Sequence, residues 1–120
     1  MHRSKYNARK TIVDGITFDS LLEATAYRYF KYSDRYCILD LQPRFELQES
    51  FKHAGMTYRK IEYVADFLIH DSKTQRTIVV DAKGVETPVF KIKLKMLLMK
   101  YPDIDFVIFK SPRQFEKLLI

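Results

Sequence analysis

The sequence YVADFLIHDSKTQRTIVVDAKG, residues 63–84, decides the fold. Its two apolar runs are separated by a polar segment, residues 71–75, that is typical of a turn. Side chains two residues apart point to the same face of a strand. We therefore expect the two runs to pair as a hairpin that brings Asp66, Asp81 and Lys83 to one side of a sheet.

Helical and extended patterns surround this hairpin. Ser20 followed by Glu23 matches a capping box and predicts a helix from Ser20 to about Tyr32. Thr87-Pro88 is a typical start for a second helix, of about thirteen residues. Strands are expected at about 44–52, 57–69, 76–83 and 106–109, the last as an inner strand because it is apolar on both faces. This order predicts an α/β or α+β domain, a mixed sheet flanked by helices.

The composition fits one basic globular domain. The chain has 120 residues, 47% of them hydrophobic, and a formal net charge of +6. That charge suggests an anionic partner, nucleic acid or an acidic membrane surface, although a small basic enzyme would look the same. We expect residues 1–10 to form a basic arm and residues 11–120 a single domain. The arm is either a solvated terminus or a phosphate-contacting segment, and its basic residues are Arg3, Lys5, Arg9 and Lys10.

Other features exclude several classes of protein. The single cysteine, Cys37, rules out an internal disulfide framework and a multi-thiolate zinc site, and its apolar neighbours predict a buried thiol. No apolar run is long enough to cross a membrane, and the basic N-terminus is not followed by the apolar segment of a secretory signal. We therefore expect a cytoplasmic protein with no membrane partner.

The acidic pair and the lysine predicted beside it are typical of metal-assisted chemistry. Two carboxylates brought together repel unless a cation lies between them, and oxygen ligands favour Mg²⁺ or Mn²⁺. Such an ion can bind a phosphodiester oxygen and activate water, while a neighbouring Lys83 stabilises negative charge or positions that water. The alternative is that Asp81 and Lys83 form an exposed ion pair of little energetic weight.

These motifs, in this order, resemble the PD-(D/E)xK nuclease superfamily, with Asp66 as the first acid and Asp81-Ala82-Lys83 as the (D/E)xK triplet. Two departures are that Ala65 replaces the proline and that the triplet acid is Asp. Within the superfamily, the chain is similar to small phage and prophage proteins of unassigned function that resemble Holliday junction resolvases. That closer similarity spans residues 5 to about 110. It is carried by KYNA (5–8), DG (14–15), FDS (18–20), EA (23–24), LQP (41–43), YVADF (63–67), DAKG (81–84) and Thr87.

The resemblance implies a restriction-endonuclease-like core, α-β-β-β-α-β, and a Mg²⁺-dependent endonuclease that hydrolyses DNA, with branched DNA as a candidate substrate in recombination. Glu23 matches a glutamate that often completes the metal site, and its alternative role is helix capping with Ser20. Gln42 and Thr87 are expected beside the site, although a turn explains Gln42 equally and a helix cap explains Thr87 better. A homodimer is expected because a resolvase cuts two strands symmetrically.

Three alternatives remain open at this stage. The chain is an active DNA nuclease, an RNA-processing nuclease, or a non-catalytic DNA-binding or phage assembly protein on a decayed nuclease fold. The second helix carries several lysines and no acid, which indicates either a solvated face or a surface that lies along a DNA backbone. The lysines expected to bind DNA are Lys91, Lys93 and Lys95.

Overall fold

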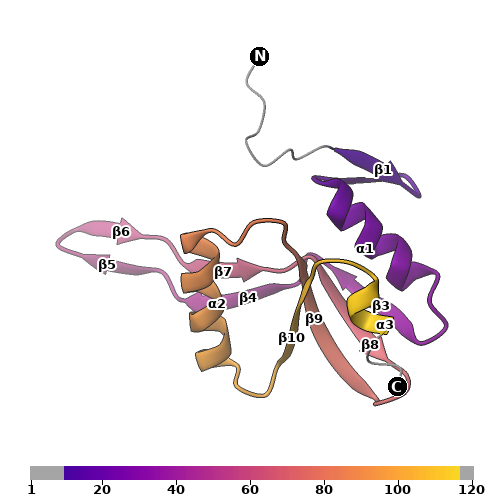
Figure 1. The fold of residues 1–120 in the computed structure, drawn as a ribbon. Coiled ribbons are helices and arrows are strands. Elements are labelled where there is room, and N and C mark those ends of the chain that lie inside the picture. The colour runs from indigo at the N-terminus through magenta and orange to yellow at the C-terminus, as the bar shows by residue number, and fades with distance from the viewer. Residues whose placement is uncertain (1–9, 117–120) are drawn as a thin grey trace.

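The computed structural model describes residues 10–116, which form three helices and ten strands (Figure 1). The helices are α1 (Leu21–Lys31), α2 (Pro88–Lys100) and α3 (Arg113–Glu116). The strands are β1 (Thr11–Val13), β2 (Ile16–Phe18), β3 (Tyr36–Leu41), β4 (Arg44–Gln48), β5 (Phe51–His53), β6 (Met56–Tyr58), β7 (Ile61–Val64), β8 (Phe67–Asp71), β9 (Arg76–Ala82) and β10 (Asp105–Phe109).

A four-stranded mixed sheet forms the centre of the fold, in the order β10-β9-β8-β3. β8 is antiparallel to both β3 and β9, whereas β10 is parallel to β9 and is reached through α2. The expected hairpin between the two apolar runs is confirmed, with Phe67 opposite Val80. The chain is therefore a mixed α+β domain. None of the helices in the described part of the chain is long and apolar enough to span a membrane.

Both faces of this sheet are buried, each against a different helix. The core on one face joins α1 and α3 to the sheet through Phe30, Phe67, Val80, Phe109 and Phe115. The core on the other face joins α2 to the sheet and to the β4–β7 pair, and its buried members are Leu47, Tyr63, Ala65, Val79, Phe90 and Leu97. Alternate residues of β9 enter opposite cores, as strand geometry requires.

Local sequence signals explain where the two long helices begin. The Ser20 hydroxyl accepts a hydrogen bond from the Glu23 backbone N–H (3.1 Å), and the Thr87 hydroxyl accepts one from the Phe90 N–H (3.1 Å). Each cap satisfies a donor that the first helical turn leaves unpaired. Both predicted starts are thus confirmed, and α1 and α2 pack on opposite faces of the sheet.

The long strand expected at 57–69 is wrong, because the chain forms three shorter strands there, β6, β7 and β8. The last break, at residues 65–66, lies opposite Gln42, which has a positive φ of 53° and donates its N–H to the carbonyl of Asp66 (3.0 Å). Tyr63 and Ala65 consequently enter the α2 core, whereas Phe67 enters the α1 core. A continuous strand would have kept all three on one face.

Two further expectations are wrong. Cys37 is exposed, because its neighbours Tyr36 and Ile38 are the residues of β3 that pack into the α1 core. β10 pairs only with β9 among the described strands and is therefore an edge, not an inner strand. Its apolar character comes from burial on both faces, since Ile108 packs in one core and Phe109 in the other.

Candidate metal and phosphodiester site

Asp66 and Asp81 are in contact at the end of β9, where the chain bends between β7 and β8. The Asp66 backbone N–H donates to Oδ1 of Asp81 (3.0 Å), and Oδ2 of Asp66 accepts from the Ala82 N–H (2.8 Å). Each carboxylate therefore accepts a hydrogen bond from a backbone N–H of the segment that carries the other carboxylate. The bend at residues 65–66 makes this possible, because it turns the Asp66 side chain towards β9 instead of leaving it in an alternating strand.

Tyr63 completes the environment of Asp81. Its hydroxyl donates to Oδ2 of Asp81, so both oxygens of this buried carboxylate have a protein donor. Asp81 is only 1% exposed, and its charge would be costly to bury without such partners. Sequence reasoning treated Tyr63 as a core residue only. The signal available was a hydroxyl-bearing tyrosine in an otherwise apolar buried set, since a buried tyrosine usually has a partner for its hydroxyl.

Burial raises the pKa of both carboxyl groups, and neighbouring negative charges add to the rise at Asp66. Burial is the largest cause of the rise in the pKa of Asp66 to about 8, followed by the negative charges of Asp81 and Glu23. Burial also raises the pKa of Asp81, against the opposing effects of the Tyr63 hydrogen bond and the Lys83 charge. A side-chain hydrogen bond joins the two carboxyl groups. The metal-free pair therefore shares a proton at neutral pH, with Asp66 as its donor.

Glu23 lies on the Asp66 side of this pair. It lines one pocket together with Asp66 and Gln42, and the negative charge of Glu23 contributes to the raised pKa of Asp66. Its own pKa is raised, first by burial and then by the Asp19 charge. Its carboxylate also accepts a long hydrogen bond from the Ser20 hydroxyl (3.5 Å). The structure thus supports helix capping and places the same carboxylate beside the acidic pair.

Lys83 lies on the Asp81 side. It lines a second pocket with Asp81, Tyr63 and Thr87, and its charge lowers the pKa of Asp81. Its amine also lies over the ring of Phe90, 5.2 Å from the centroid. Lys83 is half-buried and follows directly after β9. The structure therefore brings the four expected residues close enough for their charges to interact. The acidic pair Asp66 and Asp81 has Glu23 on one side and Lys83 on the other.

Gln42 and Thr87 both have structural roles next to this group. Gln42 provides the left-handed turn between β3 and β4 and lines the pocket of Glu23 and Asp66. Thr87 caps α2 and lines the pocket of Asp81 and Lys83. Their expected positions beside the site agree with the structure, and their backbone roles explain their presence without any contact to a ligand.

The basic residues expected to contact DNA fall into two sets. Arg3, Lys5 and Arg9 lie outside the described residues, and Lys10 is exposed. On α2, Lys91 and Lys95 are exposed, whereas Lys93 is half-buried and lines the pocket of Asp81 and Lys83. Of these three lysines, Lys93 therefore adds to the cationic side of the acidic pair, while Lys91 and Lys95 lie on the exposed surface of α2.

The side chains around the acidic pair fit a hard divalent cation in their chemistry. Glu23, Asp66 and Asp81 offer only carboxylate oxygens, which Mg²⁺ and Mn²⁺ prefer. A cation would replace the proton that now relieves the repulsion between Asp66 and Asp81. Within residues 10–116, however, no three Asp, Glu, His or Cys side chains are already grouped closely enough to hold one ion. Binding by all three carboxylates therefore requires a side chain to move. Glu23 is the carboxylate held by the longest hydrogen bond, 3.5 Å from the Ser20 hydroxyl, compared with 3.0 Å and 2.8 Å for Asp81 and Asp66.

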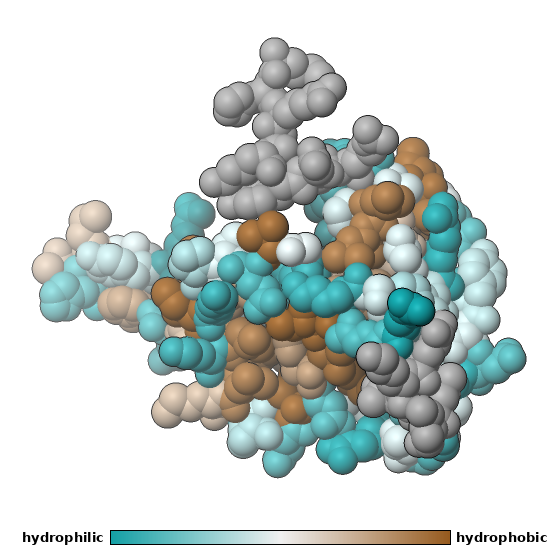
Figure 2. Space-filling view, in the orientation of Figure 1, coloured by the Kyte–Doolittle hydropathy of each residue, from teal (hydrophilic) through white to brown (hydrophobic). Residues whose placement is uncertain are grey.

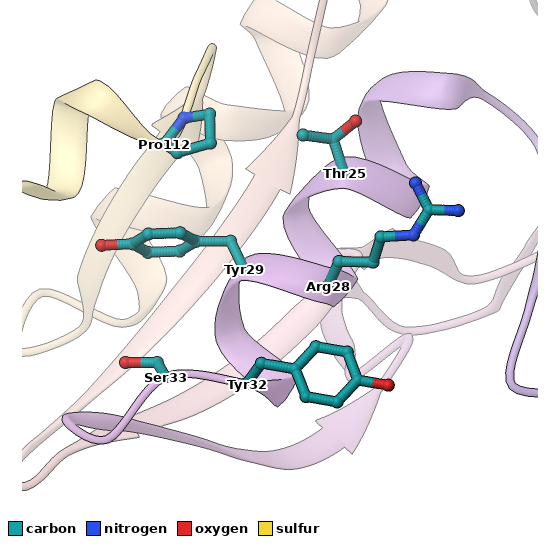
Figure 3. A pocket seen from close by; sticks show the side chains of 6 residues that line it. All are labelled: Thr25, Arg28, Tyr29, Tyr32, Ser33 and Pro112. Carbon is teal, nitrogen blue, oxygen red and sulfur yellow. The ribbon is translucent and has the colours of Figure 1, made fainter.

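A separate open pocket lies on the outer side of α1 (Figure 3). The side chains of Thr25, Arg28 and Tyr32 project from the helix, and Tyr29 extends towards Pro112. None of the residues that line this pocket belongs to the acidic pair or its neighbours. It contains no carboxylate, so it offers no comparable chemistry.

Comparisons with known proteins identify a family but no activity. No curated protein and no solved structure matches the chain. A family model described as a protein of unknown function, DUF1064, matches residues 3–116, which is nearly the whole chain and includes every residue of the acidic pair and its neighbours. The chain is therefore a member of the DUF1064 family.

Proposed function

We propose that this protein is a metal-dependent endonuclease that hydrolyses phosphodiester bonds in DNA. The observation that carries the proposal is the contact between Asp66 and Asp81, with Glu23 on one side and Lys83 on the other. The sequence of elements in the main sheet adds support. α1, β3, β8, β9, α2 and β10 follow the α-β-β-β-α-β order of the restriction-endonuclease-like core that the sequence resembles.

Each side chain has a distinct role in this proposal. Asp66, Asp81 and Glu23 would hold Mg²⁺, and the bound ion supplies positive charge that neutralises the phosphate and makes water more acidic. Lys83 positions the attacking water or stabilises charge on the phosphate as the water oxygen bonds to phosphorus and the bond to one sugar oxygen breaks. Tyr63 keeps Asp81 oriented. The sugar oxygen that leaves takes up a proton, so the products are a phosphate monoester and an alcohol.

A nucleic acid is the substrate favoured by charge, and the resemblance favours DNA. Lys93 of α2 lines the pocket of Asp81 and Lys83, and the chain carries a net charge of +6. Lysines next to a cleavage site can neutralise backbone phosphates independently of base sequence. Branched DNA is the first substrate to test, because the sequence resembles proteins related to resolvases. A homodimer would let two such sites cut two strands.

The decisive experiment is a cleavage panel. The protein is incubated with supercoiled plasmid, linear duplex, single strand, fork and four-way junction, each with Mg²⁺ or with EDTA, and Asp81→Asn is run in parallel. We expect Mg²⁺-dependent cleavage of at least one DNA that Asp81→Asn abolishes. Absence of cleavage on every DNA, or equal cleavage by the variant, would overturn the proposal. An RNA strand in the same panel tests the RNA nuclease.

A non-catalytic DNA-binding protein on the same fold is the second candidate. It is favoured by one observation, that no three ligating side chains are already grouped in the described part of the chain. Isothermal titration with Mn²⁺ discriminates between the two. A nuclease should bind the ion with a stoichiometric heat that Asp66→Asn or Asp81→Asn removes, whereas a decayed site should give no heat.

A further inference from the structure

The β5–β6 hairpin projects from the body of the protein beyond α2 and the β4–β7 pair (Figures 1 and 2). Every residue from 51 to 60 is exposed, and the two strands pair only with each other among the described strands. A two-stranded hairpin without a core beneath it is marginally stable in water. Its side chains therefore contribute little to the packing of this domain. Packing does not explain why large aromatic and basic residues stand there.

One face of this hairpin is aromatic. Phe51 and Tyr58 are cross-strand partners, and their rings stack with centroids 5.0 Å apart and an interplanar angle of 10°. They are 45% and 46% exposed. The next cross-strand pair on the same face is His53 and Met56, with Met56 62% exposed. Four large side chains with flat or polarisable surfaces thus lie together in solvent.

The charge of this hairpin is entirely basic. Residues 51–60 contain Lys52, Arg59 and Lys60, together with His53, and no acid. Lys60 lies 3.7 Å from Glu62 at the base of the hairpin. Strand alternation places Lys52 on the face opposite the aromatic pair, and Arg59 and Lys60 follow Tyr58 at the base of the hairpin. A hairpin with one aromatic face and cations on its other face and at its base complements a nucleic acid, in which flat bases alternate with phosphates.

A second copy of the chain fits this face less well. In a two-fold interface the same patch meets itself, so the basic hairpins would bring like charges together. The six strand residues are also far fewer than the roughly 20–30 residues per partner that a stable protein interface uses. A single strand of DNA satisfies both the aromatic and the charged groups, because its unpaired bases can stack on the aromatic pair and its phosphates can neutralise the cations.

We propose that the β5–β6 hairpin binds unpaired bases of branched or single-stranded DNA by stacking on Phe51 and Tyr58. This inference rests on the proposed function, from which it takes DNA as the substrate. It adds how the protein recognises that DNA. Tyr58 and Asp66 are eight residues apart, which spans at most about 26 Å of extended chain. That length corresponds to about eight nucleotides at the duplex rise of roughly 3.4 Å each, and to fewer where the strand is unpaired and more extended, so the hairpin would contact bases close to the cleaved bond.

The test measures DNA binding and cleavage separately for Phe51→Leu/Tyr58→Leu. Binding is measured in EDTA by fluorescence anisotropy, on a fork with single-stranded arms and on blunt duplex of equal length. The fork also carries 2-aminopurine in one arm, whose fluorescence falls when the base stacks. We expect at least about tenfold weaker binding of the fork, disappearance of the fluorescence change and little effect on duplex. Tyr32→Leu, which removes a tyrosine that is 70% exposed on the C-cap of α1, is the matched control and should bind like wild type.

A second variant, Lys52→Gln/Arg59→Gln, leaves the aromatic pair intact. We expect the log–log salt dependence of its fork binding to become shallower by about 0.7 for each single-strand phosphate that the hairpin no longer neutralises. Circular dichroism and the thermal midpoint check that both variants fold.

The outcomes separate this inference from the proposed function. Unchanged fork binding and fluorescence in the aromatic variant overturn the hairpin proposal even if the wild type cleaves DNA. Hairpin-dependent fork binding without cleavage by the wild type leaves this inference standing and removes the nuclease. If wild type is a dimer and the aromatic variant a monomer with unchanged DNA affinity, the hairpin joins two copies and the proposal is wrong.

Discussion

The backbone N–H of Asp66 donates to the carboxylate of Asp81, which is itself held by the Tyr63 hydroxyl. Two acids are thus joined through a backbone hydrogen bond and a shared proton. Under the proposed function, Mg²⁺ bound by Asp66 and Asp81 would displace this proton, so cation binding would be linked to proton release.

Asp81→Asn should separate catalysis from folding. The amide keeps an oxygen that can accept from the Asp66 N–H but loses the charge that binds a cation. We expect cleavage to fall by orders of magnitude while DNA binding in EDTA persists. The urea midpoint in EDTA should stay level at neutral pH, where the proton on Asp66 already relieves the repulsion, and should rise above about pH 8, where the wild type would hold two negative charges. Nicking and unfolding are measured on one preparation, and full activity of the variant would remove this site from the reaction.

Tyr63→Phe should destabilise the protein by about 1–3 kcal/mol, because it leaves an oxygen of the buried Asp81 without its donor. Tyr36→Phe is the matched control. The Tyr36 hydroxyl is buried and has no hydrogen-bond partner among the described residues, so its removal should leave stability level or raise it. Urea unfolding of both variants checks this difference. Equal destabilisation by the two changes would show that the Tyr63 hydroxyl does not support Asp81.

Stability in EDTA should fall as pH rises from about 4 to about 8. The pKa of Asp66 is raised to about 8, so the folded protein binds a proton in this window that the unfolded chain, with a pKa of about 3.9, has released. The stabilisation is complete below about pH 4 and disappears as pH rises through about 8. The raised pKa of Glu23 acts in the same direction.

Mn²⁺ should flatten this pH dependence, since the ion binds the carboxylates that the proton leaves. Urea midpoints at several pH values, with EDTA or with Mn²⁺, measure both slopes. Asp66→Asn should show a shallower slope in EDTA and no response to Mn²⁺. A wild-type profile that is identical with and without the ion contradicts the metal site.

Lys91→Gln/Lys93→Gln/Lys95→Gln should weaken binding of duplex DNA and reduce its salt dependence. The log–log slope should become shallower by about 0.9 for each duplex phosphate that these lysines neutralise in the wild type. Lys31→Gln, in the last turn of α1, is a single-charge control that should change the slope less. Binding titrations at several salt concentrations check this. An unchanged slope would mean that the three lysines of α2 are only a solvated face.

The sequence alone determined the features that depend on neighbouring residues. The caps at Ser20 and Thr87 predicted the starts of α1 and α2, because a cap is formed within three residues. The pairing of the strands around Asp66 and Asp81 followed from the turn between them and from period-two alternation. The same alternation placed the two acids and Lys83 near one another, although it assumed a continuous strand.

Only the tertiary structure decided what depends on distant segments. The break at residues 65–66 is coupled to the left-handed turn at Gln42, twenty-four residues earlier in the sequence, and alternation within one strand contains no sign of it. The exposure of Cys37 and the edge position of β10 depend on which surfaces the helices cover. The hydrogen bond from Tyr63 to Asp81 exists because the bend leaves Tyr63 in the α2 core, on the face of β9 that carries Val79 and Asp81, and hydrogen bonding and burial there are properties of the assembled fold.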